Sequence, residues 1–196
     1  AAEPYAKSPM VMAADTKDFP ALQAALKGQN PDRVVAIRLA AGPDSAARVL
    51  ELTRAGAEVI HLVFNAHGRE QGEEPRHVRD VVRDVHRTLV KERIRDAVTL
   101  AASGGVVLAE HMAKAIICGV DLVAIDTPLL VAMECRLCGE CRRGESCPIE
   151  LDQIDPAYAV RRMVNLMRAW HQQLIEVLGA MGNREVRRLR GETGWA

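Results

Sequence analysis

Four cysteines lie close together near residue 140, and thiolates at this spacing are typical ligands of a metal centre. Cys135, Cys138, Cys141 and Cys147 form the pattern C-x2-C-x2-C-x5-C-P. The two-residue gaps let one tight loop place several thiolates around a small inorganic cluster. Pro148 fixes the backbone directly after the last cysteine. The spacing therefore predicts one [4Fe–4S] cluster and, with it, an electron-transferring oxidoreductase.

Zinc, disulfides and purely structural thiols stay open as alternatives for these cysteines. Zinc also binds four thiolates, usually from two cysteine pairs that a longer spacer separates. Disulfides need an oxidising compartment, and the clustering of the cysteines argues against a distributed disulfide framework. A structural set of thiols is disfavoured by the same density. The fifth cysteine, Cys118, lies in an apolar stretch, so we expect it to be buried as a small hydrophobic residue.

A glycine-rich turn supplies a second candidate site. Ser103-Gly104-Gly105 follows one predicted strand and opens a predicted helix. Such a turn offers backbone N–H groups and the positive end of a helix, which suit a phosphate group. Thr127 ends the next predicted strand and can donate its hydroxyl to the same phosphate. Turns between strands and helices also contain glycine for steric reasons alone, so both interpretations stay open.

Histidines add little to these two sites. His67 follows the second predicted strand and could face a ligand, whereas the other five histidines are expected to pack in the core or lie on the surface. No serine or cysteine stands at a spacing from a histidine that suggests nucleophilic catalysis.

The rest of the chain predicts strands that alternate with helices. Buried strands are expected at 34–39, 59–64, 97–102 and 120–125, and helices at 15–27, 43–54, 75–89, 108–117, 155–178 and 183–190. Short connections between such elements predict a parallel sheet with right-handed crossovers. Four β/α units cannot close an eight-stranded barrel. The predicted fold is therefore α/β: a partial, TIM-barrel-like (βα)4 sheet that needs a partner, or a smaller open sheet.

This pattern divides the chain into four parts. We expect an irregular N-terminal segment with one helix at 1–32, of which residues 1–14 are irregular. A (βα)4 half-barrel follows at 33–131, an iron–sulfur loop at 132–154 and a helical extension at 155–196. The long helix of the extension should turn a stripe of apolar residues inward as core packing. This stripe consists of Val160, Met163, Met167, Trp170, Leu174 and Val177.

Composition excludes several classes of protein. Lys plus Arg equals Asp plus Glu, at 26 each, so no excess charge indicates binding to nucleic acid or to anionic lipid. The longest apolar runs are far shorter than the ~20 residues that a membrane span needs. No secretory signal pattern is visible, and clustered thiols suit a reducing compartment. We therefore expect a cytoplasmic protein.

The chain resembles the C-terminal part of the FMN-binding synthase domain of glutamate synthase, particularly the shorter archaeal-type proteins. The resemblance extends in order and spacing over about residues 16–192. It rests on the strand Val34–Leu39, on Gly56–Ile60, on the Ser103-Gly104-Gly105 turn, on Gly119–Leu130 and on the cysteine segment that ends in C-P. Cys135, Cys141 and Cys147 stand for the three cysteines of many family members. Cys138 supplies a fourth ligand, which favours [4Fe–4S] over [3Fe–4S].

The resemblance implies a TIM barrel with FMN at the carboxyl ends of its strands and an iron–sulfur cluster beside it. In that family electrons pass between cluster and flavin, and reduced flavin reduces 2-iminoglutarate to glutamate. Arg38 would take the place of a family lysine near flavin and substrate. The FMN phosphate would be contacted by Ser103, Gly104, Gly105 and Thr127.

Two departures from the family pattern bear on this site. Arg38 stands where the family has lysine, and an arginine does not exchange its proton. Asp126 stands where the family has glycine, and a carboxylate there would repel a phosphate dianion.

Three functions follow as hypotheses. The first is a redox subunit that relays electrons through one cluster, and through FMN, within a larger complex of redox subunits or with a second barrel half. The second is an active glutamate synthase-type enzyme that makes glutamate from 2-oxoglutarate and ammonia. The third is a non-enzymatic subunit in which the metal only staples the fold.

Overall fold

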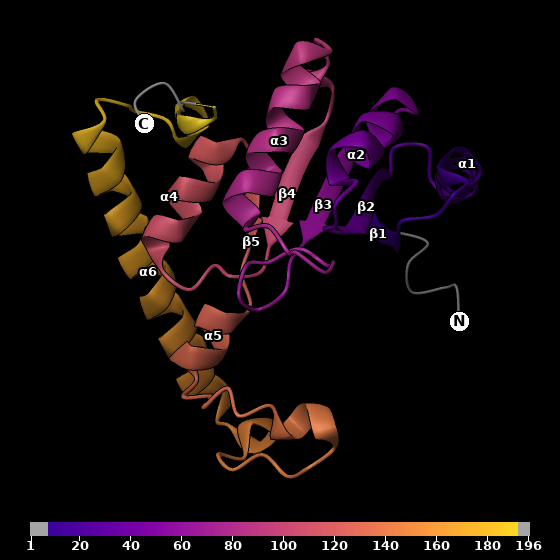
Figure 1. Cartoon of the computed structure of the whole chain (residues 1–196). Helices are drawn as coiled ribbons and strands as arrows, with labels where there is room; N and C mark the ends of the chain where they lie inside the picture. The colour runs from indigo at the N-terminus through magenta and orange to yellow at the C-terminus, as the bar shows by residue number, and fades with distance from the viewer. Residues whose placement is uncertain (1–7, 192–196) are drawn as a thin grey trace.

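The computed structural model describes residues 8–191, which form a five-stranded parallel sheet with helices (Figure 1). The strands are β1 (Met10–Ala14), β2 (Val34–Ala40), β3 (Val59–Val63), β4 (Thr99–Ser103) and β5 (Leu122–Ala124). They lie side by side in chain order, and each pairs in parallel with the next. Sequential addition of parallel strands is the arrangement within a TIM barrel. The predicted α/β fold class is therefore confirmed.

Helices connect the successive strands: α1 (Phe19–Gln29), α2 (Ser45–Arg54), α3 (Val78–Lys91) and α4 (Ala109–Cys118). Local capping explains several of their ends. The Asp18 side chain accepts a hydrogen bond from the backbone N–H of Ala21 at the start of α1. Gly119 ends α4 with φ at 126°, and a Cβ there would lie 2.5 Å from the His86 side chain. Only glycine fits at this position.

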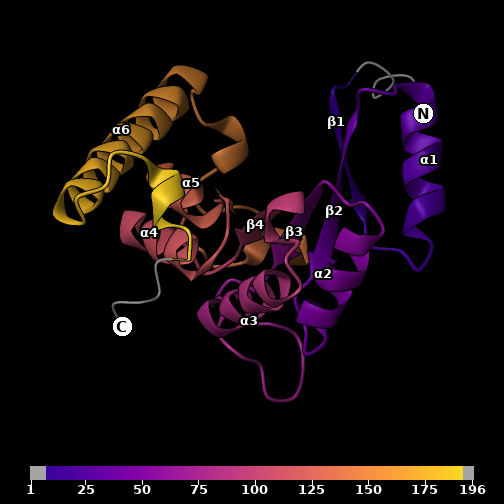
Figure 2. The ribbon, with the colours of Figure 1, turned by 90° about the horizontal axis from the view of Figure 1, so that it is seen from above.

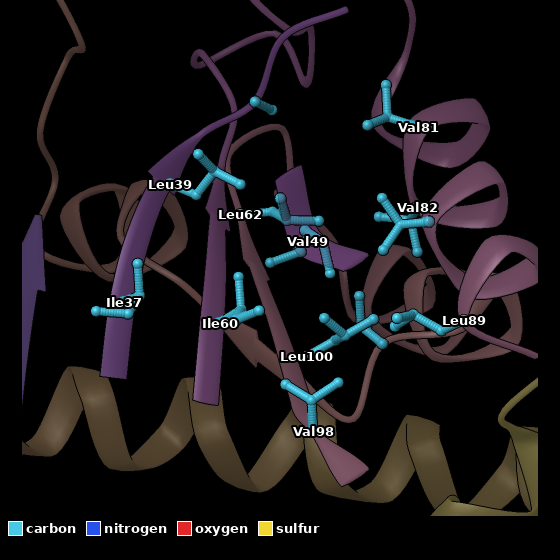
Figure 3. Packing of buried hydrophobic residues seen from close by; sticks show 14 of the residues in the cluster. Ile37, Leu39, Val49, Ile60, Leu62, Val81, Val82, Leu89, Val98 and Leu100 are labelled. Carbon is cyan, nitrogen blue, oxygen red and sulfur yellow. The ribbon is translucent and has the colours of Figure 1, made fainter. Parts of the chain in front are cut away.

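One face of the sheet packs against α2 and α3 and forms the core (Figure 3). Every second residue of the central strands points toward these helices, as the two-residue period of a strand requires. The strands contribute Ile37, Leu39, Ile60, Leu62 and Leu100, and the helices contribute Val49, Val81, Val82 and Leu89. Burial of each such side chain stabilises the fold by about 1.5–3 kcal/mol. Figure 2 shows α2 and α3 on the same side of the strands.

The opposite face of the sheet is exposed at its two edge strands. Met12 on β1 and Leu122 on β5 belong to this face and are 51% and 53% exposed. In a closed barrel of eight strands, this face would form the interior. The five strands therefore present the inner surface of an incomplete barrel.

The structure corrects several predicted boundaries. Residues 10–14 form the edge strand β1 instead of irregular chain, and the first helix begins at Phe19 instead of residue 15. A short helix α5 (Thr127–Ala132) follows β5 and was not predicted. The predicted last helix is only a 3-10 turn, η5 (Val186–Leu189). The predicted irregular residues 1–7 and the last residues of the extension, 192–196, lie outside the described part of the chain.

The long helix α6 (Pro156–Ala180) packs against α4 and α5. Trp170 is buried against Val106 and Ala109 in a small second core, so its predicted inward orientation is confirmed. Val160 and Met167, however, are 56% and 46% exposed, so their predicted inward orientation is wrong. Because α6 rests on two short helices, only a narrow stripe of it is buried. No helix within residues 8–191 has the length and apolar character of a membrane span.

A half-buried carboxylate ties the C-terminal segment to the sheet. Asp121, just before β5, accepts hydrogen bonds from the Arg95 guanidinium at 2.7 Å and from the backbone N–H of Leu100 at 2.8 Å. Its other oxygen accepts from Arg190 at 2.6 Å, and Arg190 also donates to Asp96. Burial alone would raise the pKa of Asp121, but these hydrogen bonds hold it below its usual value. The segment after α6 is thus anchored where β5 begins.

Asp121→Asn should lower the free energy of unfolding by about 3 kcal/mol, because the Arg95 guanidinium would remain buried without its counter-charge. Urea unfolding followed by circular dichroism measures this loss. Glu110→Gln is the matched control, since Glu110 pairs with Lys114 where the two side chains are 57% and 66% exposed. That change should cost less than about 1 kcal/mol. Equal losses in the two variants would show that Asp121 does not hold this segment.

Candidate functional site

The residues predicted to hold a flavin lie at the carboxyl ends of the strands. Arg38 lies on β2 with an exposed side chain on the open face, and Ser103 is the last residue of β4. Thr127 begins α5, directly after β5. The parallel strands bring these three positions to one edge of the sheet, where TIM-barrel enzymes have their active sites. Figure 1 shows the strand arrowheads pointing toward the side on which the cysteine segment lies.

His61 joins this group, although its place in a predicted strand indicated only packing or the surface. It pairs with Arg38 across the β2–β3 register, and its Nε2 lies 2.9 Å from the Ser103 hydroxyl oxygen. Burial, and then the positive charge of Arg38, lower the pKa of His61, so its ring is neutral near pH 7. Its Nδ1 is buried without a hydrogen-bond partner. A neutral imidazole therefore orients the Ser103 hydroxyl on the open face.

Gly104 and Gly105 are required by close packing of the backbone. Both have positive φ, at 98° and 73°. A Cβ on Gly104 would lie 2.5 Å from the carbonyl oxygen of Phe64, and one on Gly105 would lie 2.5 Å from the Cα of Gly68. The turn thus packs against the loop that follows β3. The helix predicted at 108–117 is α4, which begins at Ala109, so residues 106–108 separate its N-terminus from the glycines.

Asp126 occupies the donors that Thr127 could offer to a phosphate. An Asp126 carboxylate oxygen accepts from the Thr127 backbone N–H at 2.5 Å and lies 3.2 Å from the Thr127 hydroxyl oxygen. This carboxylate caps α5 from its own chain. A phosphate at this position would have to displace a like charge.

The cysteine segment forms a tight loop between α5 and α6, at the end of the molecule that projects from the sheet (Figure 1). Glu134, Leu137, Gly139 and Gly144 have left-handed backbone conformations, which let the loop turn sharply. Two of these four residues, Glu134 and Leu137, are not glycine. In these two residues the left-handed conformation costs steric energy.

All four cysteines of the loop line a single hollow of about 560 Å³. Its lining includes Cys135, Cys138, Cys141 and Cys147 together with apolar residues such as Leu130 and Ile149. Cys135 and Cys147 are half-buried, whereas Cys138 and Cys141 are exposed. The backbone N–H of Leu137 points to the Cys135 sulfur at 3.5 Å, a type of contact that tunes iron–sulfur clusters.

The spacing of these thiols differs from that of a single-ion site. Within residues 8–191, no three Cys, His, Asp or Glu side chains are grouped closely enough to hold one metal ion. A cubane holds its cysteine sulfurs farther apart than one ion does, because iron and sulfide lie between them. The four thiols thus share one hollow without forming a single-ion site.

Both ends of the cysteine loop are fixed to the helices beside it. The Tyr158 hydroxyl donates to the carboxylate of Glu134 at 2.5 Å, directly before the first cysteine. Arg162 donates to the carbonyl of Ala132 at 2.7 Å. Asp155 caps the start of α6 by accepting from two backbone N–H groups. The loop is thus held at its base while its tip faces solvent.

Solved structures with a similar fold include flavocytochrome b2 and mandelate oxidase. A flavocytochrome b2 mutant matches with a TM-score of 0.60 at 17% identity, over 91% of this chain and 38% of that one. A mandelate oxidase mutant with an FMN adduct matches with a TM-score of 0.57 at 16% identity, over 88% and 45% of the two chains. At such low identity these matches show the barrel fold alone.

Sequence relatives are more specific. The archaeal glutamate synthase [NADPH] of Archaeoglobus fulgidus is 34% identical over 191 residues, which cover 89% of this chain and 37% of the relative. The archaeal-type glutamate synthase [NADPH] of Dehalococcoides mccartyi is 31% identical, over 89% and 38%. The chain thus spans little more than a third of the length of these relatives.

The family model described as the conserved region in glutamate synthase matches residues 6–184, which include the strands, the glycine turn and the cysteine loop. This match agrees with the identities to the archaeal-type enzymes over most of the chain. The chain belongs to the glutamate synthase family.

Proposed function

We propose that this chain is an iron–sulfur oxidoreductase unit of glutamate synthase type, which relays electrons through a [4Fe–4S] cluster within a larger assembly. The observation that carries the proposal is the single hollow lined by four thiols. Cys135, Cys138, Cys141 and Cys147 would each bind one iron of the cluster. When bound, the cluster takes up and releases single electrons.

The surroundings of the thiols suit such a relay. The exposed Cys138 and Cys141 would place one side of the cluster at the surface, where a redox partner can approach it. Apolar residues such as Leu130 line the hollow and limit access of water to the other side. Net charge and solvent exposure are among the factors that set cluster potentials, and the loop also carries three arginines. One of them, Arg143, is paired with Glu145.

The larger assembly is supported by the open face of the sheet. An exposed apolar face on parallel strands is normally covered, because parallel sheets are buried on both sides. The partners that we propose are the remaining strands of the barrel, in the same protein or in another chain, and further redox subunits. The chain spans only 37% of the length of the Archaeoglobus fulgidus relative, which agrees with this proposal.

FMN is the second redox cofactor that the family resemblance implies, and its phosphate can be tested against this structure. Asp126 already accepts from Thr127, and its charge opposes a phosphate dianion. The position at Asp126 and Thr127 therefore does not fit the phosphate, and no step of the proposed relay uses FMN. The flavin contacts that the resemblance assigns stay a prediction. They involve Arg38, Ser103, Gly104, Gly105 and Thr127.

A second candidate is glutamate synthesis by the whole assembly, which the names of the sequence relatives support. Arg38 stands where the family has lysine and stays protonated, so it can hold a carboxylate but cannot deliver a proton. The neutral His61, in contact with Ser103, is the group at this edge that can exchange one. We rank the electron relay first because its ligand set is complete within this chain.

Cys138→Ser should remove one cluster ligand, so the isolated protein should lose the four-iron cluster or keep a three-iron form. Iron and acid-labile sulfide per chain, with electron paramagnetic resonance of the reduced protein, measure this change under anaerobic conditions. Cys118→Ala is the matched control, because Cys118 lies in α4, outside the hollow. The control should keep its full iron content. An intact four-iron cluster in Cys138→Ser would remove Cys138 from the ligand set.

Asp126→Gly should raise the affinity for FMN by about tenfold or more, because it removes a negative charge beside the phosphate position. Quenching of flavin fluorescence during a titration with protein measures the dissociation constant. Asp44→Gly is the matched control: Asp44 also follows a strand end and precedes a helix, and its side chain makes no capping bond. If both variants bind FMN with the same affinity, the phosphate does not lie at Asp126.

A further inference from the structure

A second hollow lies between α3 and α4, on the helix side of β4. Its volume is about 460 Å³, which falls in the usual range for small-molecule sites. Ala102 of β4 lines it. The neighbouring residue Ser103 contacts His61 on the open face, and successive strand residues point to opposite faces. The hollow thus lies on the helix side of β4, and it adjoins the predicted flavin turn, because Gly104 and Gly105 also line it.

The inner part of the hollow is apolar. Its lining includes Val82 of α3 and Ala115 of α4, together with Ala102 and Val106. Small side chains at two of these four positions leave the space open. Such a surface suits the hydrocarbon part of a ligand, because burial of apolar area is favourable.

The polar side chains of the lining are hydrogen-bond donors with no carboxylate among them. Arg79 and His77 lie at the start of α3, and Lys114 and His111 lie on α4. The Nδ1 of His77 accepts from the backbone N–H of Arg79, and that of His111 accepts from Val107. Because Nδ1 accepts in both rings, Nε2 is the nitrogen that can donate. Four side chains thus offer donors at one hollow, and two of them are the basic side chains of Arg79 and Lys114.

Nearby carboxylates do not prevent these basic side chains from binding an anion. Arg79 pairs with Asp80 and Lys114 pairs with Glu110, but in both pairs each side chain is at least 44% exposed. Exposed pairs of this kind contribute little, so a ligand anion can compete for the cations. The thiol of Cys118 also lines the hollow. Burial raises its pKa, so it stays neutral and adds no negative charge.

We propose that this hollow binds a small carboxylate with an apolar body, such as a short-chain fatty acid or a branched 2-oxo acid. The apolar floor takes the hydrocarbon part, and the cations on α3 and α4 take the carboxylate. The proposal does not rest on the iron–sulfur relay, since no residue of the hollow belongs to the cysteine loop.

Hexanoate is the probe, and hexanol, which has the same hydrocarbon chain without the charge, is its control. In methyl-detected nuclear magnetic resonance of the full chain, hexanoate should shift the methyl signals of Val82 and Ala115 in a saturable manner. Hexanol should bind at least about tenfold more weakly, since it lacks the charge-assisted hydrogen bonds. Absence of saturable shifts, or equal binding of the two probes, would overturn the proposal.

Variants test the two parts of the site separately. The double variant Arg79→Gln with Lys114→Gln should reduce hexanoate binding to the level of hexanol and leave hexanol binding unchanged. Lys91→Gln, at the far end of α3, is the charge control and should bind hexanoate normally. Ala115→Trp should fill the hollow and abolish binding of both probes. Unchanged hexanoate binding in the double variant would contradict the role of the cations, whether or not Ala115→Trp folds.

Discussion

The carboxylate of Asp121 holds together the two ends of the chain segment that carries the cysteines. It lies just before β5, from which the chain leaves the sheet through α5 and the cysteine loop, and it binds Arg190, at which the chain returns after α6. Its other contacts, to Arg95 and the backbone of Leu100, fix it to the base of β4. The ion pair of the buried Arg95 with the half-buried Asp121 adds little net stability compared with apolar packing, but loss of one partner is costly. The main effect of the interaction is therefore to fix the position at which the chain returns to the sheet after α6. Its contribution to the stability of the fold is smaller.

This anchoring gives the cysteine loop a fixed position relative to the strand ends. The loop is clamped at its base by the Tyr158–Glu134 and Arg162–Ala132 hydrogen bonds, and its tip is solvent-exposed. A cluster bound there would lie on the side toward which the strands point (Figure 1). The exposed Cys138 and Cys141 would leave such a cluster accessible to a redox partner.

Sequence patterns were sufficient for the central strands, because that signal is local. Val35, Ala36, Ile37 and Leu39 are buried as the β-branched, apolar run predicts, whereas the cluster ligands stay a prediction. The edge strand β1 was missed, since Met10–Ala14 has a single β-branched residue and is a strand only through its pairing with β2. The His61–Ser103 contact was missed because it joins residues 42 positions apart and depends on the strand register. The steric role of Gly104 likewise depends on the distant carbonyl of Phe64.

The most direct test of the cluster is native mass spectrometry of the full chain purified under nitrogen. A relay built on Cys135, Cys138, Cys141 and Cys147 predicts a mass increment of four irons and four sulfides, which disappears after treatment with an iron chelator and an oxidant. A chain that carries a single zinc ion, or no metal at all, would contradict the iron–sulfur account and leave only the barrel scaffold.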